Sequence, residues 1–149
     1  MPAWVENNGI PGDRFFDLGP VPNHRIPTWL RKADVAIFPN RCEAGTNLVA
    51  MECMACGVPT ILSANTGHLD IIREGICLPL HRQRTAIDVT GDGTEGWGES
   101  DVDELVEALE TIWQDRRTAS EIGTRAAAHL QTMTWSTQLE KLKIVLLSV

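Results

Sequence analysis

One short segment, residues 41–52, most constrains how this chain folds. Four apolar residues at 35–38 precede it, as expected for a buried strand, and apolar residues with helical spacing follow it. Between them lies a polar turn that ends in Gly45, Thr46 and Asn47. The pattern predicts a strand that turns directly into a helix, so the first free amide groups of the helix point back toward the carboxyl end of the strand.

The start of this helix has the properties of an anion site. Unpaired amide groups and the positive end of the helix dipole both favour a phosphate group. Two carboxylates flank the site, Glu43 before the helix and Glu52 within it. A phosphate group alone needs no carboxylate, whereas the hydroxyl groups of a sugar donate hydrogen bonds to one. The segment therefore predicts a ligand that carries both a phosphate and a ribose or another sugar.

Each polar residue of the segment also has a simpler explanation. Glu52 lies about 9 Å along the helix from Thr46, a distance that suits a ribose attached through a diphosphate. The alternatives to a ligand are that Glu52 is a solvated helix residue or pairs with a nearby arginine. Its sequence neighbours are nearly all apolar, so we expect a mostly buried helix in which a lone carboxylate needs a partner. Glu43 is otherwise an exposed loop residue or a partner of Arg41. Thr46 and Asn47 also suit helix caps.

Size and charge limit the classes of function. The 149 residues suffice for one domain, 1–149, with a buried core, and 43% hydrophobic residues argue against disorder. A net charge of −7 argues against nonspecific binding to nucleic acid or anionic membranes. No signal peptide or membrane span is predicted, so we expect a cytoplasmic protein. Membrane contact is at most peripheral, on the inner face, through residues 141–147.

The four cysteines do not predict a disulfide framework at this size. Cys53 and Cys56 have the CxxC spacing of some zinc and redox sites, but no second pair follows and both lie in the predicted helix. We therefore favour buried helix cysteines over metal ligands.

Short apolar runs alternate with helical patterns through the first half of the chain, which is typical of βα units around a parallel sheet. We expect strands at residues 15–19, 35–39, 60–63 and 76–80. Helices or helical turns are expected at 26–31, 46–56, where Gly57 is the stop, and 67–72. Residues 1–13 resemble the end of a helix and a loop rather than a first strand, so we expect one or two strands of the sheet to be absent from this chain.

Residues 81–100 are polar and glycine-rich and predict a long, functional or mobile loop, which precedes a helical tail at 100–149. Ser100 begins an amphipathic helix with Asp103 as its capping-box partner. The expected buried stripe of this helix comprises Val102, Leu105, Val106, Leu109 and Trp113. Two further helices are expected at 117–131 and 136–147.

Several segments, in the right order, resemble one enzyme family. The carboxyl-terminal domain of retaining GT-B glycosyltransferases, in particular the large group-1 (GT4-like) family, is similar to residues 33–41, 43–52 and 54–61. Residues 16–22 resemble the phenylalanine-x-x-glycine-x-valine strand and turn of that family, and residues 63–72 resemble its glycine loop and helix. The resemblance covers residues 14–80 and, loosely, the helical tail.

The resemblance implies an α/β fold: a Rossmann-like parallel sheet of about four strands with helices on both faces, an incomplete GT-B carboxyl-terminal half. It implies that Glu52, matching the second glutamate of the family's E-x7-E motif, binds the hydroxyl groups of the donor ribose. Glu43 matches the first glutamate, which contacts the transferred sugar near the reacting centre. Eight residues rather than seven separate the two, and the aligned position is Ala44. Glu43 therefore either enters through a one-residue bulge or leaves that role vacant.

The same resemblance assigns the rest of the donor site. Backbone amides that contact the diphosphate and sugar match Gly45, Thr46, Asn47 and Leu48. The nucleobase is held where Val21 and Asn23 lie. His68 stands at the usual second glycine of the family's loop, where it is either an exposed residue at a helix start or a ligand-binding residue. The family's basic pair, which neutralises the diphosphate, lies on strands that are absent here.

The sequence therefore predicts the donor-binding half of a glycosyltransferase, which binds a nucleotide-diphosphate sugar without a metal or other cofactor. We expect it to be inactive without an amino-terminal domain, supplied in cis or in trans, that carries the acceptor site. The alternative is a noncatalytic nucleotide-sugar or phosphate-binding module that acts as a subunit of a partner protein. Exposed apolar surface around Trp29, Trp97, Trp135 and the last helix would indicate a separate partner domain.

Overall fold

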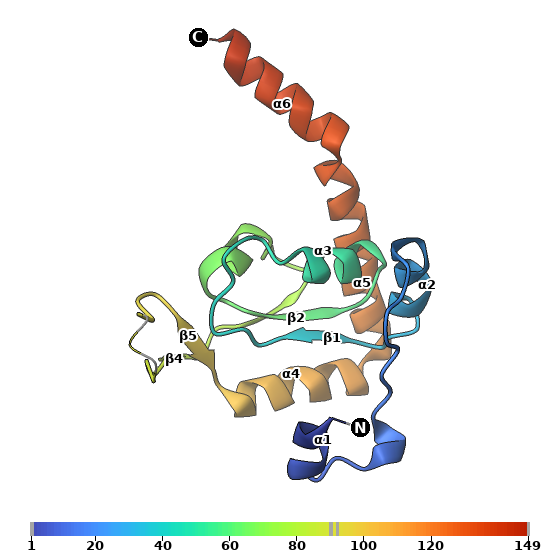
Figure 1. Cartoon of the computed structure of the whole chain (residues 1–149). Coiled ribbons are helices and arrows are strands. Elements are labelled where there is room, and N and C mark those ends of the chain that lie inside the picture. Colours follow the sequence, from blue (N-terminus) through green and yellow to red (C-terminus); the bar gives the residue numbers. More distant parts are fainter. Residues whose placement is uncertain (1, 90, 92, 149) are drawn as a thin grey trace.

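The centre of the molecule is a parallel sheet of three strands. The structure is a computed structural model that describes residues 2–89, 91 and 93–148. The strands lie in the order β1 (Ala36–Phe38), β2 (Thr60–Ser63) and β3 (Leu78–Leu80). Helices cover both faces, with α3 (Leu48–Ala55) and α4 (Val102–Gln114) on opposite sides (Figure 1). The predicted α/β fold with a parallel sheet is confirmed.

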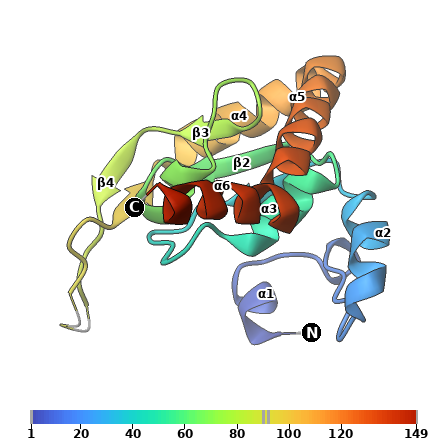
Figure 2. The ribbon, with the colours of Figure 1, turned by 90° about the horizontal axis from the view of Figure 1, so that it is seen from above.

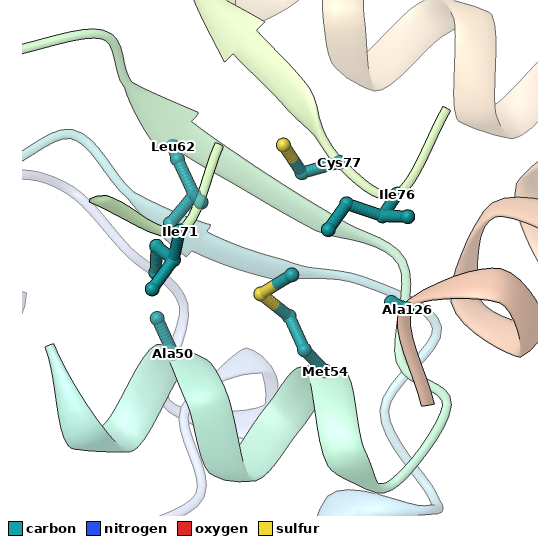
Figure 3. Close-up of a cluster of buried hydrophobic side chains, with 7 residues drawn as sticks. All are labelled: Ala50, Met54, Leu62, Ile71, Ile76, Cys77 and Ala126. Carbon is teal, nitrogen blue, oxygen red and sulfur yellow. The ribbon is translucent and has the colours of Figure 1, made fainter. Parts of the chain in front are cut away.

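The middle strand β2 joins the two halves of the core. All four of its residues are buried, and its two apolar side chains, Ile61 and Leu62, point to opposite faces because side chains alternate along a strand. Leu62 belongs to a cluster with Met54 of α3 and Ala126 of α5 (Arg116–Leu130), shown in Figure 3. Ile61 packs with Ile112 of α4 on the other face. Such two-sided burial explains why two adjacent residues of this strand are both apolar, rather than every second one.

Helix α3 buries one side and exposes the other. Ala50, Cys53 and Met54 are buried at the spacing of one helical face, whereas Glu52 is exposed. The expectation of a mostly buried helix with a buried carboxylate is therefore wrong. The helix ends where predicted, because Gly57 adopts a φ of 79°, a left-handed conformation that suits glycine.

The expected strand at residues 15–19 does not form in the described chain. Its residues have no strand pairing, Gly19 has a left-handed φ of 58°, and Phe16 is 83% exposed. The segment does not pair with β1, although β1 is an edge strand of this sheet. The amide of Ala36 bonds to Pro59, on the side of β2, so the backbone groups of Ile37 point to the open edge, and its side chain is 39% exposed. No further strand lies there to receive the amino-terminal segment among the described residues.

The rest of the amino-terminal region consists of short helices around this edge. They are α1 (Ala3–Asn7), the 3₁₀ turns η1 (Gly12–Arg14) and η2 (Asn23–Arg25), and α2 (Ile26–Leu30). The predicted helix and loop before residue 14, and the predicted helix near residue 26, are confirmed.

The expected loop at 81–100 instead contains an antiparallel hairpin, β4 (Gln83–Thr85) with β5 (Gly98–Ser100). The side-chain amide of Asn65 fixes it by donating to the carbonyl of Gly98 at 3.0 Å and to the side chain of Gln83 at 3.1 Å. Ser100 consequently ends a strand, and the cap of α4 is Asp101, whose carboxylate accepts from the amide of Glu104. The predicted capping box is wrong by one residue.

The expected buried stripe of α4 is only half correct. Leu105 and Leu109 pack against the sheet, together with Ile112. Val102 and Trp113, both expected to be buried, are 70% and 69% exposed. Val106 is 49% exposed. A sheet of three strands offers too narrow a face to cover the whole apolar side of this helix.

The last helix, α6 (Trp135–Leu147), projects away from the body of the molecule (Figure 1), and in the view from above it is drawn in front of β2 and α3 (Figure 2). It follows the short turn η4 (Gln131–Met133), and no described residue of it is buried. Its exposed apolar side chains are Trp135, Leu139, Leu142, Ile144, Val145, Leu146 and Leu147. In the described part of the chain, none of the helices has the length and apolar character that crossing a bilayer requires.

Gly123 tests the packing of α5 against α3. A methyl group there would overlap the carbonyl oxygen of Gly57, at the end of α3. Gly→Ala normally stabilises a helix, but here we expect Gly123→Ala to lower the free energy of unfolding by about 2 kcal/mol because the backbones must separate. Chemical denaturation measures this. Ala128→Ser, at an exposed position of α5, is the control, and equal stability of the two variants would contradict the close contact.

Candidate functional site

The amino-terminal end of α3 presents unpaired backbone amides at the carboxyl end of β1. Asn47 is the N-cap, with a φ of 57°, and its side-chain oxygen accepts from the amide of Ala50 at 3.0 Å. The first helical bond runs from the amide of Met51 to the carbonyl of Asn47. Among the described residues, nothing accepts a hydrogen bond from the amides of residues 45–49. These amides are free to bind an anion, as the sequence predicted for Gly45 to Leu48.

A second loop holds the segment before α3 in place. The loop after β2 leads into the 3₁₀ turn η3 (Thr66–Asp70). Its Gly67 amide donates to the carbonyl of Glu43 at 3.0 Å, and the Thr66 hydroxyl accepts from the amide of Glu43 at 2.8 Å. The two backbones touch here, since a side chain at Gly67 would overlap the carbonyl of Gly45. The path of residues 43–45 is therefore set by the neighbouring strand's loop.

His68 lies directly behind this segment and is fully buried. Its Nδ1 is 3.0 Å from the carbonyl oxygen of Ser63, and its Nε2 is 2.9 Å from the side-chain nitrogen of Asn47. A carbonyl can only accept, so Nδ1 carries the proton and Nε2 accepts from Asn47. Burial lowers the pKa of His68 below its ordinary value, although the hydrogen bond to Ser63 and the charge of Glu43 oppose the shift. Neither alternative from the sequence, an exposed residue or a ligand-binding one, describes this buried histidine.

A pocket of about 240 Å³ lies between α3 and the η2–α2 segment. Asn23, expected to hold the nucleobase, and Glu52, expected to hold the ribose, both line it. The remaining lining is Ile26, Pro27, Leu30, Ala55 and Cys56. The sequence did not single out these apolar residues, although Ile26 and Leu30 share the apolar face of the predicted helix at 26–31. Val21 is half-buried and does not line this pocket.

One face of α3 connects the free amides with the pocket. Leu48, Glu52 and Ala55 follow each other at four- and three-residue spacing, so they lie in a row along the helix. Leu48 is 71% exposed, and Glu52 and Ala55 are also exposed. From Leu48 to Glu52 the helix rises about 6 Å. An anion at the helix start and a polar ring at Glu52 can therefore belong to one extended ligand.

Glu43 lies near the amides but outside the pocket lining. Its carboxylate is half-buried and accepts from the side-chain amide of Asn40 at 3.1 Å. Arg41, its expected alternative partner, instead pairs with Glu99 of β5 at 2.8 Å. Thr46, the other candidate in this loop, directs its hydroxyl to the sulfur of Met51 at 3.3 Å. The structure thus brings Glu43 to the loop with the free amides, and its contact with a sugar stays a prediction.

Of the CxxC pair, only Cys53 is a buried packing residue, as expected, whereas Cys56 is half-buried and lines the pocket. Cys53 is buried, and burial, together with the charges of Cys56 and Glu52, raises the pKa of its thiol to about 11. A thiol with that pKa stays protonated at neutral pH, which suits a core residue better than a nucleophile or metal ligand. In the described residues, no group of three or more His, Cys, Asp or Glu side chains is arranged to hold a metal ion.

Gly67 and Gly45 offer a matched test of the contact between the two loops. We expect Gly67→Ala to disrupt the loop before α3, because its methyl group has no space, and to lower the free energy of unfolding by about 2 kcal/mol. Gly45→Ala meets open space and should change stability by less than about 0.5 kcal/mol. Thermal unfolding of both variants measures the difference. Similar losses would show that the loops are not in contact in solution.

The comparison with known sequences identifies related glycosyltransferases. A model of family 4 glycosyltransferases in conflict systems matches residues 23–142. The D-inositol 3-phosphate glycosyltransferase of Paenarthrobacter aurescens (strain TC1) is 31% identical over 132 residues, covering 89% of this chain and 28% of that protein. The enzyme of the same name from Corynebacterium diphtheriae is 31% identical over 133 residues, 89% of this chain and 26% of that protein. The chain thus spans about a quarter of the length of these curated relatives.

Solved structures of the same fold superpose on nearly the whole chain. Sucrose-phosphate synthase from Thermosynechococcus elongatus has a TM-score of 0.73 at 24% identity, covering 98% of this chain and 33% of that one. Anabaena HepE in complex with UDP also has a TM-score of 0.73, at 18% identity, covering 99% of this chain and 35% of that one. These similarities establish the fold.

Proposed function

The chain belongs to the group-1, GT4-like glycosyltransferase family, and from this premise we propose that it is a donor-binding domain for a nucleotide-diphosphate sugar. The observation that supports this most is the row along α3, which joins unpaired amides at residues 45–49 to a pocket containing Glu52 and Asn23. The arrangement has the polarity of such a donor, with its negative charge at the positive end of a helix and its hydroxyl groups at a carboxylate.

Each part of the donor then has a partner. The diphosphate accepts hydrogen bonds from the amides of Gly45, Thr46, Asn47 and Leu48. Glu52 accepts from the two vicinal hydroxyl groups of the ribose, and the nucleobase enters the pocket toward Asn23 and the apolar side of α2. Val21, which does not line the pocket, stays a predicted nucleobase contact. UDP and UDP-glucose are bound by the solved Anabaena HepE, which supports a donor of this class.

In the reaction we assign to the family, the bond between the anomeric carbon and the diphosphate oxygen breaks, and the oxygen leaves with the electron pair. The acceptor hydroxyl bonds to the same face of that carbon and loses its proton, so the configuration is retained. The amides of α3 stabilise the leaving charge, because they are fixed before the reaction begins. Glu43 would contact the transferred sugar from the loop before α3. No metal is assigned a role.

Glu52→Gln tests the ribose contact. We expect affinity for UDP to fall about tenfold, because two charge-assisted hydrogen bonds are weakened, while inorganic pyrophosphate binds as before. Calorimetry with EDTA present measures both ligands and also tests the expected independence of metal. Glu74→Gln, at an exposed glutamate outside the site, is the control. Unchanged affinity of Glu52→Gln for UDP would refute the ribose contact.

Catalysis is proposed to need a second domain. The chain corresponds to about a quarter of its curated relatives, and α6 exposes a continuous apolar surface that no described residue covers. Trp135, at the start of α6, is 84% exposed, and Trp29 and Trp97 are each 39% exposed. These are the features expected of a separate amino-terminal domain that docks on this half.

A complementation experiment separates the enzyme from the noncatalytic binding module. We expect the chain alone to transfer no sugar from UDP-glucose, and the chain mixed with the amino-terminal part of the Paenarthrobacter relative to release UDP. Leu142→Asp with Leu146→Asp should weaken association of the two parts, because charges replace an apolar contact surface. A mixture that associates and binds UDP but releases none would favour the noncatalytic module.

A further inference from the structure

The position of His68 is unusual for a titratable side chain. It is fully buried beneath the loop with the free amides, yet it lies outside the pocket. Both of its ring nitrogens are used, one toward the end of β2 and one toward the N-cap of α3. An apolar residue would fill the same space without the cost of burying an imidazole, so the hydrogen bonds themselves need an explanation.

We propose that His68, in its neutral form, is a positioning residue that fixes the amides at residues 45–49 for the donor diphosphate. This proposal rests on the proposed function, because it deepens the role of the same site. It assigns no contact between His68 and the ligand. His68 acts instead through Asn47, whose backbone and side chain form the start of α3.

The hydrogen bonds that connect β2 with α3 through His68 and Asn47 allow only one assignment of donors and acceptors. The carbonyl of Ser63 accepts from Nδ1 of His68, Nε2 accepts from the side-chain nitrogen of Asn47, and the Asn47 oxygen accepts from the amide of Ala50. If Asn47 were flipped, its nitrogen would face the amide of Ala50, donor against donor. The neutral tautomer of His68 therefore selects the orientation in which Asn47 caps the helix.

Asn47 needs this support because its backbone is in the left-handed region, with a φ of 57°. That conformation is uncommon for residues other than glycine, and it lies in the middle of the run of amides, residues 45–49, that have no acceptor among the described residues. Without the contact to His68, the side chain of Asn47 is no longer held in the orientation that caps α3.

Protonation of His68 would place an N–H group on Nε2 against the donor nitrogen of Asn47 and break the contact. Glu43 is the charged group that acts on His68, and its charge favours protonation, whereas burial disfavours it more strongly. The packed strand β2 contributes only uncharged side chains. Asp70 on η3 and Glu52 on α3 are exposed to solvent. The site should therefore work in the neutral range and lose the diphosphate on acidification.

The experiment compares UDP affinity between pH 7.5 and pH 5.5 for the full chain and three variants. His68→Gln keeps an acceptor for Asn47 but does not titrate in this range. His68→Leu removes the acceptor, and His81→Gln removes an exposed histidine outside the site as a matched control. Acid also protonates the terminal phosphate of UDP, but this lowers affinity equally for all four proteins.

We expect affinity of the wild-type chain to fall more than that of His68→Gln over this range, by at most about tenfold because burial lowers the pKa of His68. His81→Gln should follow the wild type. At pH 7.5, His68→Leu should bind about tenfold more weakly than the wild type, whereas His68→Gln should stay within about threefold. In each of the four proteins that folds, the Ala50 amide should exchange slowly with solvent only if the Asn47 side chain still accepts its hydrogen bond.

Two outcomes overturn the proposal, and they differ. If the wild type and His68→Gln bind UDP with the same pH profile, His68 does not position the site, although the proposed function stands. If the wild type binds no UDP at any pH, the proposed function fails and this proposal fails with it. Should His68→Leu not fold, the comparison with His68→Gln still decides between these outcomes.

Discussion

Burial of β2 between two layers of helices is the constraint on which the rest of the molecule depends. Ile61 and Leu62 each anchor one half of the core, so the strand cannot shift without disturbing both clusters. The same strand ends at the candidate site, where the carbonyl of Ser63 receives His68 and its hydroxyl lies 2.7 Å from that of Ser100. Strand β2 thereby positions the core, the hairpin of β4 and β5, and the loop before α3.

In the proposed donor site, backbone amides rather than Arg41 or Arg84 would bind the diphosphate, because these two arginines pair with Glu99 and Asp101. With a net charge of −7, the surface as a whole repels anions. In the proposed donor site, the attraction for a diphosphate is supplied by the oriented amides at residues 45–49, and it acts only at short range. This makes the conformation of the loop, more than the charge of the chain, the determinant of binding.

Local patterns in the sequence were sufficient for the elements that bury apolar residues at regular spacing. The parallel strands β1 and β2, the stop of α3 at Gly57 and the three helices of the tail were all predictable from periodicity and turn residues. The free amides at residues 45–48 followed from a strand that runs into a helix. That Asn23 and Glu52 belong to one site was predicted only from the resemblance to a family, because 29 positions separate them in the sequence and no local pattern joins them.

Features that depend on distant partners could not be predicted in the same way. The hairpin at 83–100 is held by Asn65, which lies in another loop, and its strands carry no alternating pattern. His68 gave no sign of burial, because its two partners, Ser63 and Asn47, come from different elements. At residues 15–19 the local preference for a strand was present, but a strand also needs a pairing partner elsewhere in the chain, and this segment pairs with no described strand.

The open edge of β1 has a consequence for how the isolated chain behaves at high concentration. Ile37 presents unpaired peptide groups and an apolar side chain at that edge, a template on which a second polypeptide can add by backbone hydrogen bonding. Unshielded templates of this kind promote aggregation, and mutual repulsion between acidic copies is the main force that opposes it here. Salt screens this repulsion but leaves the unpaired backbone groups of β1 unchanged, so we expect aggregation of the isolated chain to increase with ionic strength.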